Sequence, residues 1–327
     1  MKNLFSFGLL FSLLWGPIML IFPGVSSALE SDQYMTWGRD LRDISSELNT
    51  HVNRTIQQAL SELSERKETI SCAKAHDFAV KKFRGFIVHK IETWLEEELG
   101  DDLYPRADMS YPDYFQISIY NFPYSAVGRF FPMGRNLNVN GVILGADKLA
   151  HFFSTGLRYF TLFTKAKKKG MSDEQATRKA ILYGVSLERS YLGLWPSGVF
   201  SFGDLEANYQ GLQMNRRFCD GDQAYLAQDA EGQWRLANTI DMGDFINPYM
   251  DETFNPSFFG LLKWPKVKPM LKKYCPRKNS PAVVTRMDFY KSVAKKSYNI
   301  QYLDELKASG DRRIPDREKQ YLSVICR

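Results

Sequence analysis

Gly145-Ala-Asp-Lys-Leu-Ala-His-Phe-Phe-Ser-Thr-Gly-Leu-Arg-Tyr-Phe-Thr-Leu-Phe163 is the stretch of this 327-residue chain that decides its fold. It is strongly apolar and predicts a buried helix from about Ala146 to Lys169. Polar residues recur in it at steps of four, three and four. This spacing places them on one face of the helix, and they are Asp147, His151, Ser154 and Arg158. Because a polar stripe on a buried helix needs partners, the stretch also predicts an internal polar site.

The next two helices are expected to supply those partners. A helix over about 172–192, opened by a Ser-x-x-Gln capping box, carries Glu188 on its apolar side. An unpaired carboxylate is costly in such a place. A helix that starts after Ser201 aligns Asp204 and Asn208 on one face. We therefore expect one polar cluster where the three helices meet.

An ordinary structural role is open to each of these polar residues as well. The structural alternatives are that Asp147 caps its helix, that His151 is a satisfied core histidine, that Glu188 pairs with Lys148 or Arg158, and that Ser201 and Asp204 form a cap pair. The two interpretations differ in access. A catalytic site needs a cleft that reaches Glu188, whereas a packing network is sealed.

The remaining segments predict a mainly α fold, a helical domain with one short β-hairpin. Apolar residues at steps of three and four over 41–63 predict a long amphipathic helix, and a second helix over about 72–99 is expected to pair with it. Residues 101–141 are rich in Pro, Tyr, Asn and Gly and are expected to form an ordered surface loop. A hairpin is expected within 224–237 and a closing helix over about 286–308.

These elements divide the chain into four expected parts. The first is a signal peptide, 1–28, and the second is an N-terminal helical hairpin, 29–100. A core helical domain with the polar site follows over 101–220. The last part, 221–327, holds the β-hairpin, a basic loop and the closing helix.

The N-terminus has the three parts of a secretory signal. A basic start, Met1-Lys-Asn, precedes an apolar run to Phe22 and a small-residue end, Val25-Ser-Ser-Ala28. The alternative is an uncleaved anchor, because the apolar run is long enough to span a bilayer. We expect cleavage before Leu29 and a protein exported to the periplasm or outer envelope.

Four cysteines remain after the signal, and an even number in an exported chain predicts two disulfides. Three connectivities are open. Of these we favour Cys219–Cys275 with Cys72–Cys326, because each bond would tie a flanking segment to a helix end.

The charge balance narrows the class of partner. The formal net charge is +6, a mild excess that suits a cell-wall polymer or another anionic envelope surface. Residues 263–278 carry seven basic side chains and no acidic one. This run is either a solvated connector or a contact strip for an anionic polymer or lipid headgroups. Peripheral membrane contact is therefore open, and no nucleic-acid partner is expected.

The polar residues also carry a family resemblance. The pattern Asp147-Lys148-x-x-His151-Phe152, then Glu188, then Ser201-x-x-Asp204-x-x-Ala207-Asn208-x-x-Gly211 resembles the VanZ-like superfamily and is similar to the YfiM-like bacterial envelope proteins. It covers about 70 residues of the 327. The resemblance implies an envelope protein with a polar site, and it implies no particular reaction.

Two chemistries follow from the residue types. In the first, Glu188 is the general acid of a hydrolase that acts on cell-wall glycan, with Asp204 as the second carboxylate. In the second, Asp147, His151, Glu188 and Asp204 surround a divalent metal, although a single nearby histidine does not favour zinc. We predict the hydrolase without a cofactor or metal ion, and a non-enzymatic scaffold or binding protein is the alternative.

The site residues are assigned by type. Catalytic roles are predicted for Glu188, Asp204 and His151, and binding roles for Asp147, Lys148, Ser201, Asn208 and Arg158. The oligomeric state stays open.

Overall fold

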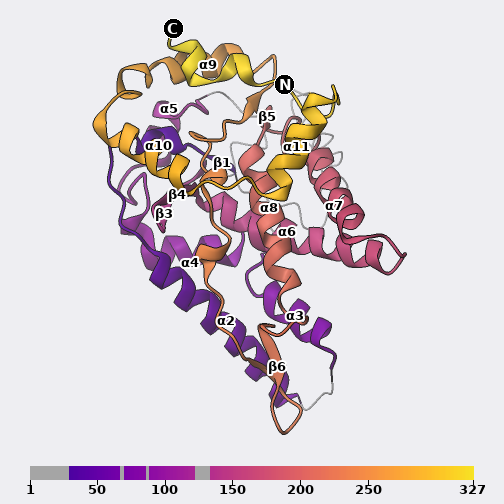
Figure 1. Ribbon diagram of the computed structural model, residues 1–327. Coiled ribbons are helices and arrows are strands. Elements are labelled where there is room, and N and C mark those ends of the chain that lie inside the picture. The colour runs from indigo at the N-terminus through magenta and orange to yellow at the C-terminus, as the bar shows by residue number, and fades with distance from the viewer. Residues whose placement is uncertain (1–28, 67–69, 86–87, 122–132) are drawn as a thin grey trace, which may run out of the picture.

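The computed structural model describes residues 29–66, 70–85, 88–121 and 133–327. The described chain is mainly helical, as predicted, with short two-stranded sheets (Figure 1). The expected signal peptide, 1–28, lies outside the described residues. Among the residues that are described, no helix is long and apolar enough to cross a bilayer.

The helices in chain order are α2 (Ser45–Glu65), α3 (Cys72–Lys81), α4 (Lys90–Leu99), α5 (Tyr111–Ile117), α6 (Ala146–Lys167), α7 (Asp173–Glu188), α8 (Phe202–Arg216), α9 (Trp264–Lys272), α10 (Pro281–Val293), α11 (Tyr298–Ala308) and α12 (Leu322–Ile325). The paired strands are β1 (Leu29–Ser31) with β2 (Met133–Gly134), β3 (Asn136–Val139) with β4 (Val142–Gly145), β5 (Val199–Phe200) with β8 (Phe258–Phe259), and β6 (Leu226–Gln228) with β7 (Trp234–Leu236).

Helices α6 and α8 form the centre of the fold and touch backbone to backbone. A Cβ atom added to Gly156 would lie 2.7 Å from the Cα of Gly211, and one added to Gly211 would lie 2.1 Å from the carbonyl oxygen of Phe152. Only glycine allows this approach at both positions. The contact fixes which faces of the two helices meet, and it brings their polar residues together.

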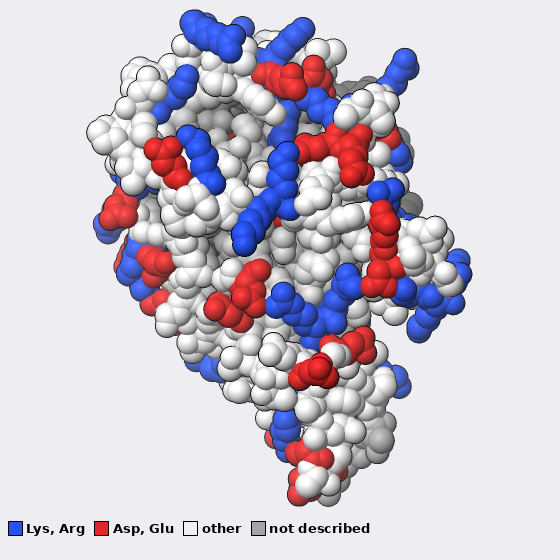
Figure 2. Space-filling model, in the orientation of Figure 1, with Lys and Arg blue, Asp and Glu red and all other residues white. Residues whose placement is uncertain are grey.

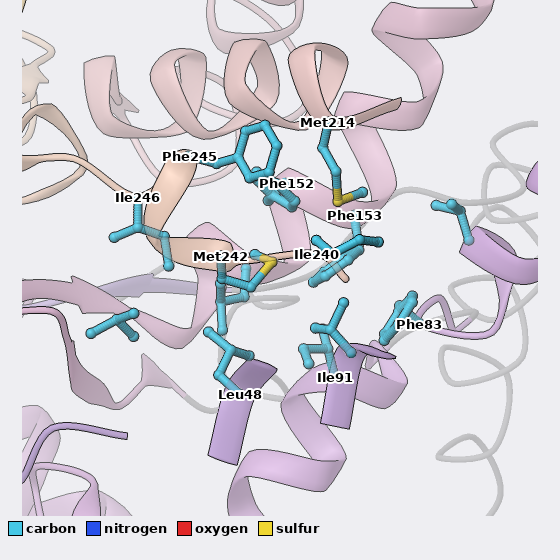
Figure 3. Packing of buried hydrophobic residues seen from close by; sticks show 14 of the residues in the cluster. Leu48, Phe83, Ile91, Phe152, Phe153, Met214, Ile240, Met242, Phe245 and Ile246 are labelled. Atoms are coloured by element: carbon cyan, nitrogen blue, oxygen red, sulfur yellow. The ribbon is translucent and has the colours of Figure 1, made fainter. Parts of the chain in front are cut away.

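The core joins parts of the chain that are far apart in sequence. Figure 3 shows Phe152 and Phe153 of α6 packed among side chains of the N-terminal helices, such as Leu48 and Ile91, and of the later chain, such as Phe245. Phe83 stacks on Phe153 with ring centroids 4.2 Å apart. The N-terminal helices therefore share one core with α6 and α8.

The helix predicted over 72–99 is two helices, α3 and α4. The chain folds back at Gly85, where an added Cβ would lie 1.8 Å from the carbonyl oxygen of Val88. The His89 side chain then accepts a hydrogen bond from the Gly85 N–H at 3.1 Å, and Glu92 completes a capping box that starts α4. The helical periodicity runs through this break, so the pattern did not reveal it.

A second hairpin, β3–β4, lies in the segment that was expected to be loop. Asn140 and Gly141 both have positive φ, 51° and 78°, and form the turn between the two strands. Asn-Gly between apolar runs is a strong hairpin signal, so the prediction of a loop here was wrong. Since β4 ends at Gly145, the N-cap of α6, this hairpin sets where the central helix begins.

The C-terminal part also differs from its prediction. The expected hairpin within 224–237 is present as β6 and β7. The single closing helix over 286–308 is two helices, α10 and α11, with Ser297 as the N-cap of the second. Within 263–278 lies a helix, α9, which Pro265 opens at a position where its missing N–H costs nothing.

Two disulfides form as predicted, but the favoured pairing was wrong. The bonds are Cys72–Cys219 and Cys275–Cys326, and the described residues contain no free cysteine. Cys72 starts α3 beside the end of α8, where His76 packs on Phe218. Cys326 ends α12, which lies on α9. The packing of α3 against α8 and of α12 against α9 therefore determines which cysteines pair.

Candidate functional site

A charged cluster lies at the start of α6, and we call it the Lys148 centre. The Lys148 side chain is 0% exposed, and its Nζ lies 2.7 Å from each of three carboxylates, those of Asp147, Asp204 and Glu252. Burial alone lowers the pKa of Lys148, but these carboxylates outweigh burial and hold the pKa well above its ordinary value. The ammonium is therefore charged and is the cation around which the acids gather.

Ser201 links this centre to the start of α8. Its hydroxyl accepts a hydrogen bond from the Asp204 N–H at 3.0 Å, so it caps the helix as the structural alternative predicted. The same hydroxyl donates to Glu252 Oε1 at 2.8 Å. The carboxylate of Asp204 is not used in the cap, because it lies between Lys148 and His151.

His151 lies one turn beyond Asp147 on α6 and faces α8. Its Nε2 is 3.1 Å from Asp204 Oδ2, and its Nδ1 is 3.2 Å from Asn208 Oδ1. The ring is 5% exposed. The structure thus brings the predicted residues of α6 and α8 into one cluster, and both ring nitrogens have partners on α8.

Glu188, at the end of α7, completes the predicted set. Its side chain is 0% exposed, and its Oε2 accepts a hydrogen bond from the Ser201 N–H at 3.1 Å. Among the described residues, its Oε1 has no hydrogen-bond partner. Burial, followed by the nearby charge of Asp204, raises the pKa of Glu188 well above its ordinary value. Among the described residues, Glu188 forms no ion pair with Lys148 or Arg158, and its hydrogen-bond donor is the Ser201 N–H. The structural alternative that paired Glu188 with one of these cations was therefore wrong.

Two acidic members of the Lys148 centre were missed in the sequence. Glu252 lies in the short loop between a 3-10 helix at Pro248–Met250 and β8, and its Oε2 accepts a hydrogen bond from the Tyr120 hydroxyl at 2.8 Å. Glu30, from β1, is 5% exposed, and burial followed by the charges of Asp204 and Glu252 raises its pKa well above its ordinary value. Neither residue belongs to a periodic pattern, so no local signal marked them.

Asp147 does not cap its helix. The N-cap of α6 is Gly145, and the carboxylate of Asp147 accepts a hydrogen bond from the Ser31 hydroxyl on one oxygen and contacts Lys148 with the other. Arg158 is only partly buried. The Lys148 centre therefore contains the predicted residues other than Arg158, together with Glu30, Ser31 and Glu252.

The acidic residues of the Lys148 centre are almost completely buried. Asp147, Glu188, Asp204 and Glu252 are each at most 3% exposed. Five carboxylates, including Glu30, thus share one lysine and one histidine inside the protein. Burying that many ionisable groups is costly, so the centre is not what packing alone would select.

A different feature marks the outer surface, and we call it the α9 strip. It consists of Leu261 and Leu262, which are 89% and 88% exposed, and the basic run 263–278 that follows them. On α9 itself Val267, Met270 and Leu271 are buried, so the lysines lie on the opposite, exposed face. Figure 2 shows Lys and Arg side chains gathered at the end of the molecule that α9 forms.

Trp195 adds a third exposed apolar side chain beside the strip. It is 76% exposed and lies in the turn between α7 and β5. This turn touches the strip, because a Cβ added to Gly198 would lie 2.2 Å from the Lys263 side chain. No ion pair is formed, within the described part of the chain, by Lys266, Lys268, Lys272, Lys273 or Arg277 of the strip.

A scan against protein-family models, a search of curated proteins and a search of solved structures each found no match to this chain. The resemblance to the VanZ-like and YfiM-like proteins therefore stays a prediction.

Proposed function

We propose that this chain is an exported protein of the cell envelope that attaches to an anionic phospholipid surface through the α9 strip. The observation that carries the proposal is the exposure of Leu261 and Leu262, at 89% and 88%, directly before the basic run. Adjacent leucines that remain in water favour insertion into a lipid interface. The two disulfides are compatible with an exported protein.

The chemistry of the strip favours lipid over cell-wall polymer as the anionic partner. Basic side chains attract phosphate groups of either kind, and each lysine near an anionic membrane contributes about 1 kcal/mol. The exposed leucines and Trp195 gain nothing from a hydrated polymer, whereas they lose their contact with water when they enter the headgroup region. Leucines and lysines together therefore fit a membrane surface.

Binding to lipid vesicles tests this proposal. We expect the full chain without its signal to sediment with vesicles of phosphatidylglycerol and not with vesicles of phosphatidylcholine, and we expect added salt to weaken the binding. The double change Leu261→Ser and Leu262→Ser should weaken binding at least about tenfold, because burial of a leucine is worth about 1.5–3 kcal/mol.

A matched control is available on α10. Val284 and Val293 are 43% and 44% exposed, and their replacement by serine should leave vesicle binding unchanged. Equal vesicle binding by the double leucine variant and the wild type would refute the membrane proposal. Retained binding of that variant to purified sacculi, without any vesicle binding by the wild type, would show that the partner is cell-wall polymer.

Glycan hydrolysis with Glu188 as the general acid is the competing hypothesis. The raised pKa of Glu188 supports it, because a proton donor must keep its proton near neutral pH. The burial of Glu188, at 0% exposed, opposes it, because a glycan has to reach the acid. We expect no release of soluble fragments from sacculi by the wild type. Release that falls about 100-fold or more in Glu188→Gln would establish the hydrolase instead.

A further inference from the structure

We propose that His151, Glu188 and Asp204 form a site for a divalent transition-metal ion inside the protein. One ligand atom from each of the three side chains lies within 4.8 Å of the others, and all three residues are buried. The site goes beyond the membrane attachment proposed above and does not depend on it, because the α9 strip and the Lys148 centre share no residue.

The hydrogen bonding of His151 places its Nε2 atom against another acceptor. With the Asn208 amide oriented as it is, its oxygen accepts from His151 Nδ1–H at 3.2 Å. In the neutral ring Nε2 is then an acceptor. It lies 3.1 Å from Asp204 Oδ2, which is also an acceptor. Two acceptors at this distance need a proton or a cation between them, which is either a proton on the ring or on Asp204, or a metal ion bound by both.

Glu188 provides an independent observation that favours the metal ion. Its side chain is fully buried, and Oε1 has no hydrogen-bond partner in the described part of the chain, although Glu188 lies in one group with His151 and Asp204. A second proton on His151 would pair with Asp204 and leave Glu188 Oε1 as it is. A proton on Glu188 would give Oε1 something to share with a neighbouring acceptor, but only a metal ion gives all three side chains a common partner.

A second group of acidic residues, which also includes Asp204, provides a comparison because it contains a cation. Glu30, Asp147 and Asp204 also have ligand atoms within 4.8 Å of one another. There the ammonium of Lys148 is the cation, at 2.7 Å from both aspartates. Within the described part of the chain, no lysine or arginine forms an ion pair with Glu188. The two groups share the carboxylate of Asp204. The group with Glu30 and Asp147 has the ammonium of Lys148 as its cation, and the metal ion would fill that role in the group with His151 and Glu188.

The donor set selects the class of metal. One imidazole nitrogen and two carboxylate groups suit ions of the series from Mn²⁺ to Zn²⁺, whereas Mg²⁺ and Ca²⁺ prefer oxygen donors alone. Asn208 serves as the outer partner that fixes the ring orientation, as such partners do for metal-bound histidines. The ligands are at most 5% exposed, so an ion bound there would be shielded from bulk solvent.

Metal analysis of the full chain, prepared without a histidine tag, tests the inference. After incubation with Zn²⁺ or Mn²⁺ and removal of free ions, we expect about one ion per folded chain by mass spectrometry. We expect Glu188→Gln, which keeps the side-chain shape, to lose the ion. Glu252→Gln is the matched control, since it removes an equally buried acid on the Lys148 side and should retain the ion.

A second variant keeps the test decisive if Glu188→Gln fails to fold. Asn208→Ala leaves all three ligands in place and should weaken Zn²⁺ affinity about 10–100-fold. A folded wild type that holds neither ion overturns the inference, as does a nitrogen NMR spectrum in which His151 is doubly protonated in the presence of Zn²⁺. Vesicle binding is measured separately, and failure of either proposal leaves the other untouched.

Discussion

The ammonium of Lys148 and the carboxylate of Asp204 lie 2.7 Å apart, and their side chains are only 0% and 4% exposed. The two residues come from the first turns of α6 and α8, so their contact ties together the ends of the helices that touch at Gly156 and Gly211. An ion pair in this position is costly to break. Removal of one partner leaves the other charge buried and uncompensated.

We therefore expect Lys148→Met to destabilise the protein severely. The methionine fills a similar volume, but three carboxylates lose their cation. The free energy of unfolding, measured by denaturant titration, should fall by about 3–5 kcal/mol or more. The control is Lys296→Met, which breaks a pair with Asp304 whose side chains are more than half exposed. That change should cost less than about 1 kcal/mol, and equal losses in the two variants would contradict the central role of Lys148.

The close approach of α6 and α8 predicts a large effect of one methyl group. In Gly156→Ala the new Cβ would lie 2.7 Å from the Cα of Gly211, which is backbone and cannot turn aside. The helices must separate, and we expect a loss of about 1–3 kcal/mol in thermal unfolding experiments. Gly260→Ala is the control, because its Cβ meets the nearest atom at an ordinary 3.4 Å. Unchanged stability of Gly156→Ala would show that the two helices do not pack as described.

The disulfides should contribute unequally to stability. Cys72–Cys219 closes a loop with a sequence separation of 147 residues, and Cys275–Cys326 one of 51. The longer loop restricts the unfolded chain more, so replacing the first pair by serines should cost about 1 kcal/mol more than replacing the second. Peptide mapping without reduction checks the pairing itself. A peptide that links Cys219 to Cys275 would restore the pairing favoured from sequence.

Asp32 should make stability depend on pH. Its side chain is 0% exposed, and burial, opposed by hydrogen bonds from the backbone of Ile119 and others, raises its pKa to about 7. The native state then binds the proton more tightly than the unfolded state. This contribution to stability is fully present below the unfolded pKa, about 4, and is lost as the pH rises through about 7.

The comparison of Asp32→Asn with the wild type isolates this contribution. Asparagine does not titrate, so the stability of the wild type relative to the variant should fall between pH 4 and pH 8, by on the order of 4 kcal/mol. Urea titrations at several pH values measure the difference. Stability curves that stay parallel over this range would show that Asp32 has an ordinary pKa in the folded protein.

The sequence alone determined α6, α7 and α8 and the polar faces on which they meet. Helical periodicity is local, and it placed Asp147, His151, Glu188, Asp204 and Asn208 on the right faces without any knowledge of the fold. The Ser-x-x-Gln box at the start of α7 is present for the same reason, since its hydrogen bonds lie within four residues. Patterns of this kind depend only on the rise and turn of a helix.

Only the tertiary structure decided which charges share the centre. Glu252 reaches Lys148 across 104 positions of sequence, and Glu30 comes from a short strand near the start of the described chain. The disulfide partners of Cys72 and Cys275 likewise depend on which helix ends lie side by side in the folded chain. Such contacts arise when distant segments bury their apolar faces together, and a local pattern holds no information about them. The physical reason is that periodicity fixes the face of a helix, whereas packing fixes what that face meets.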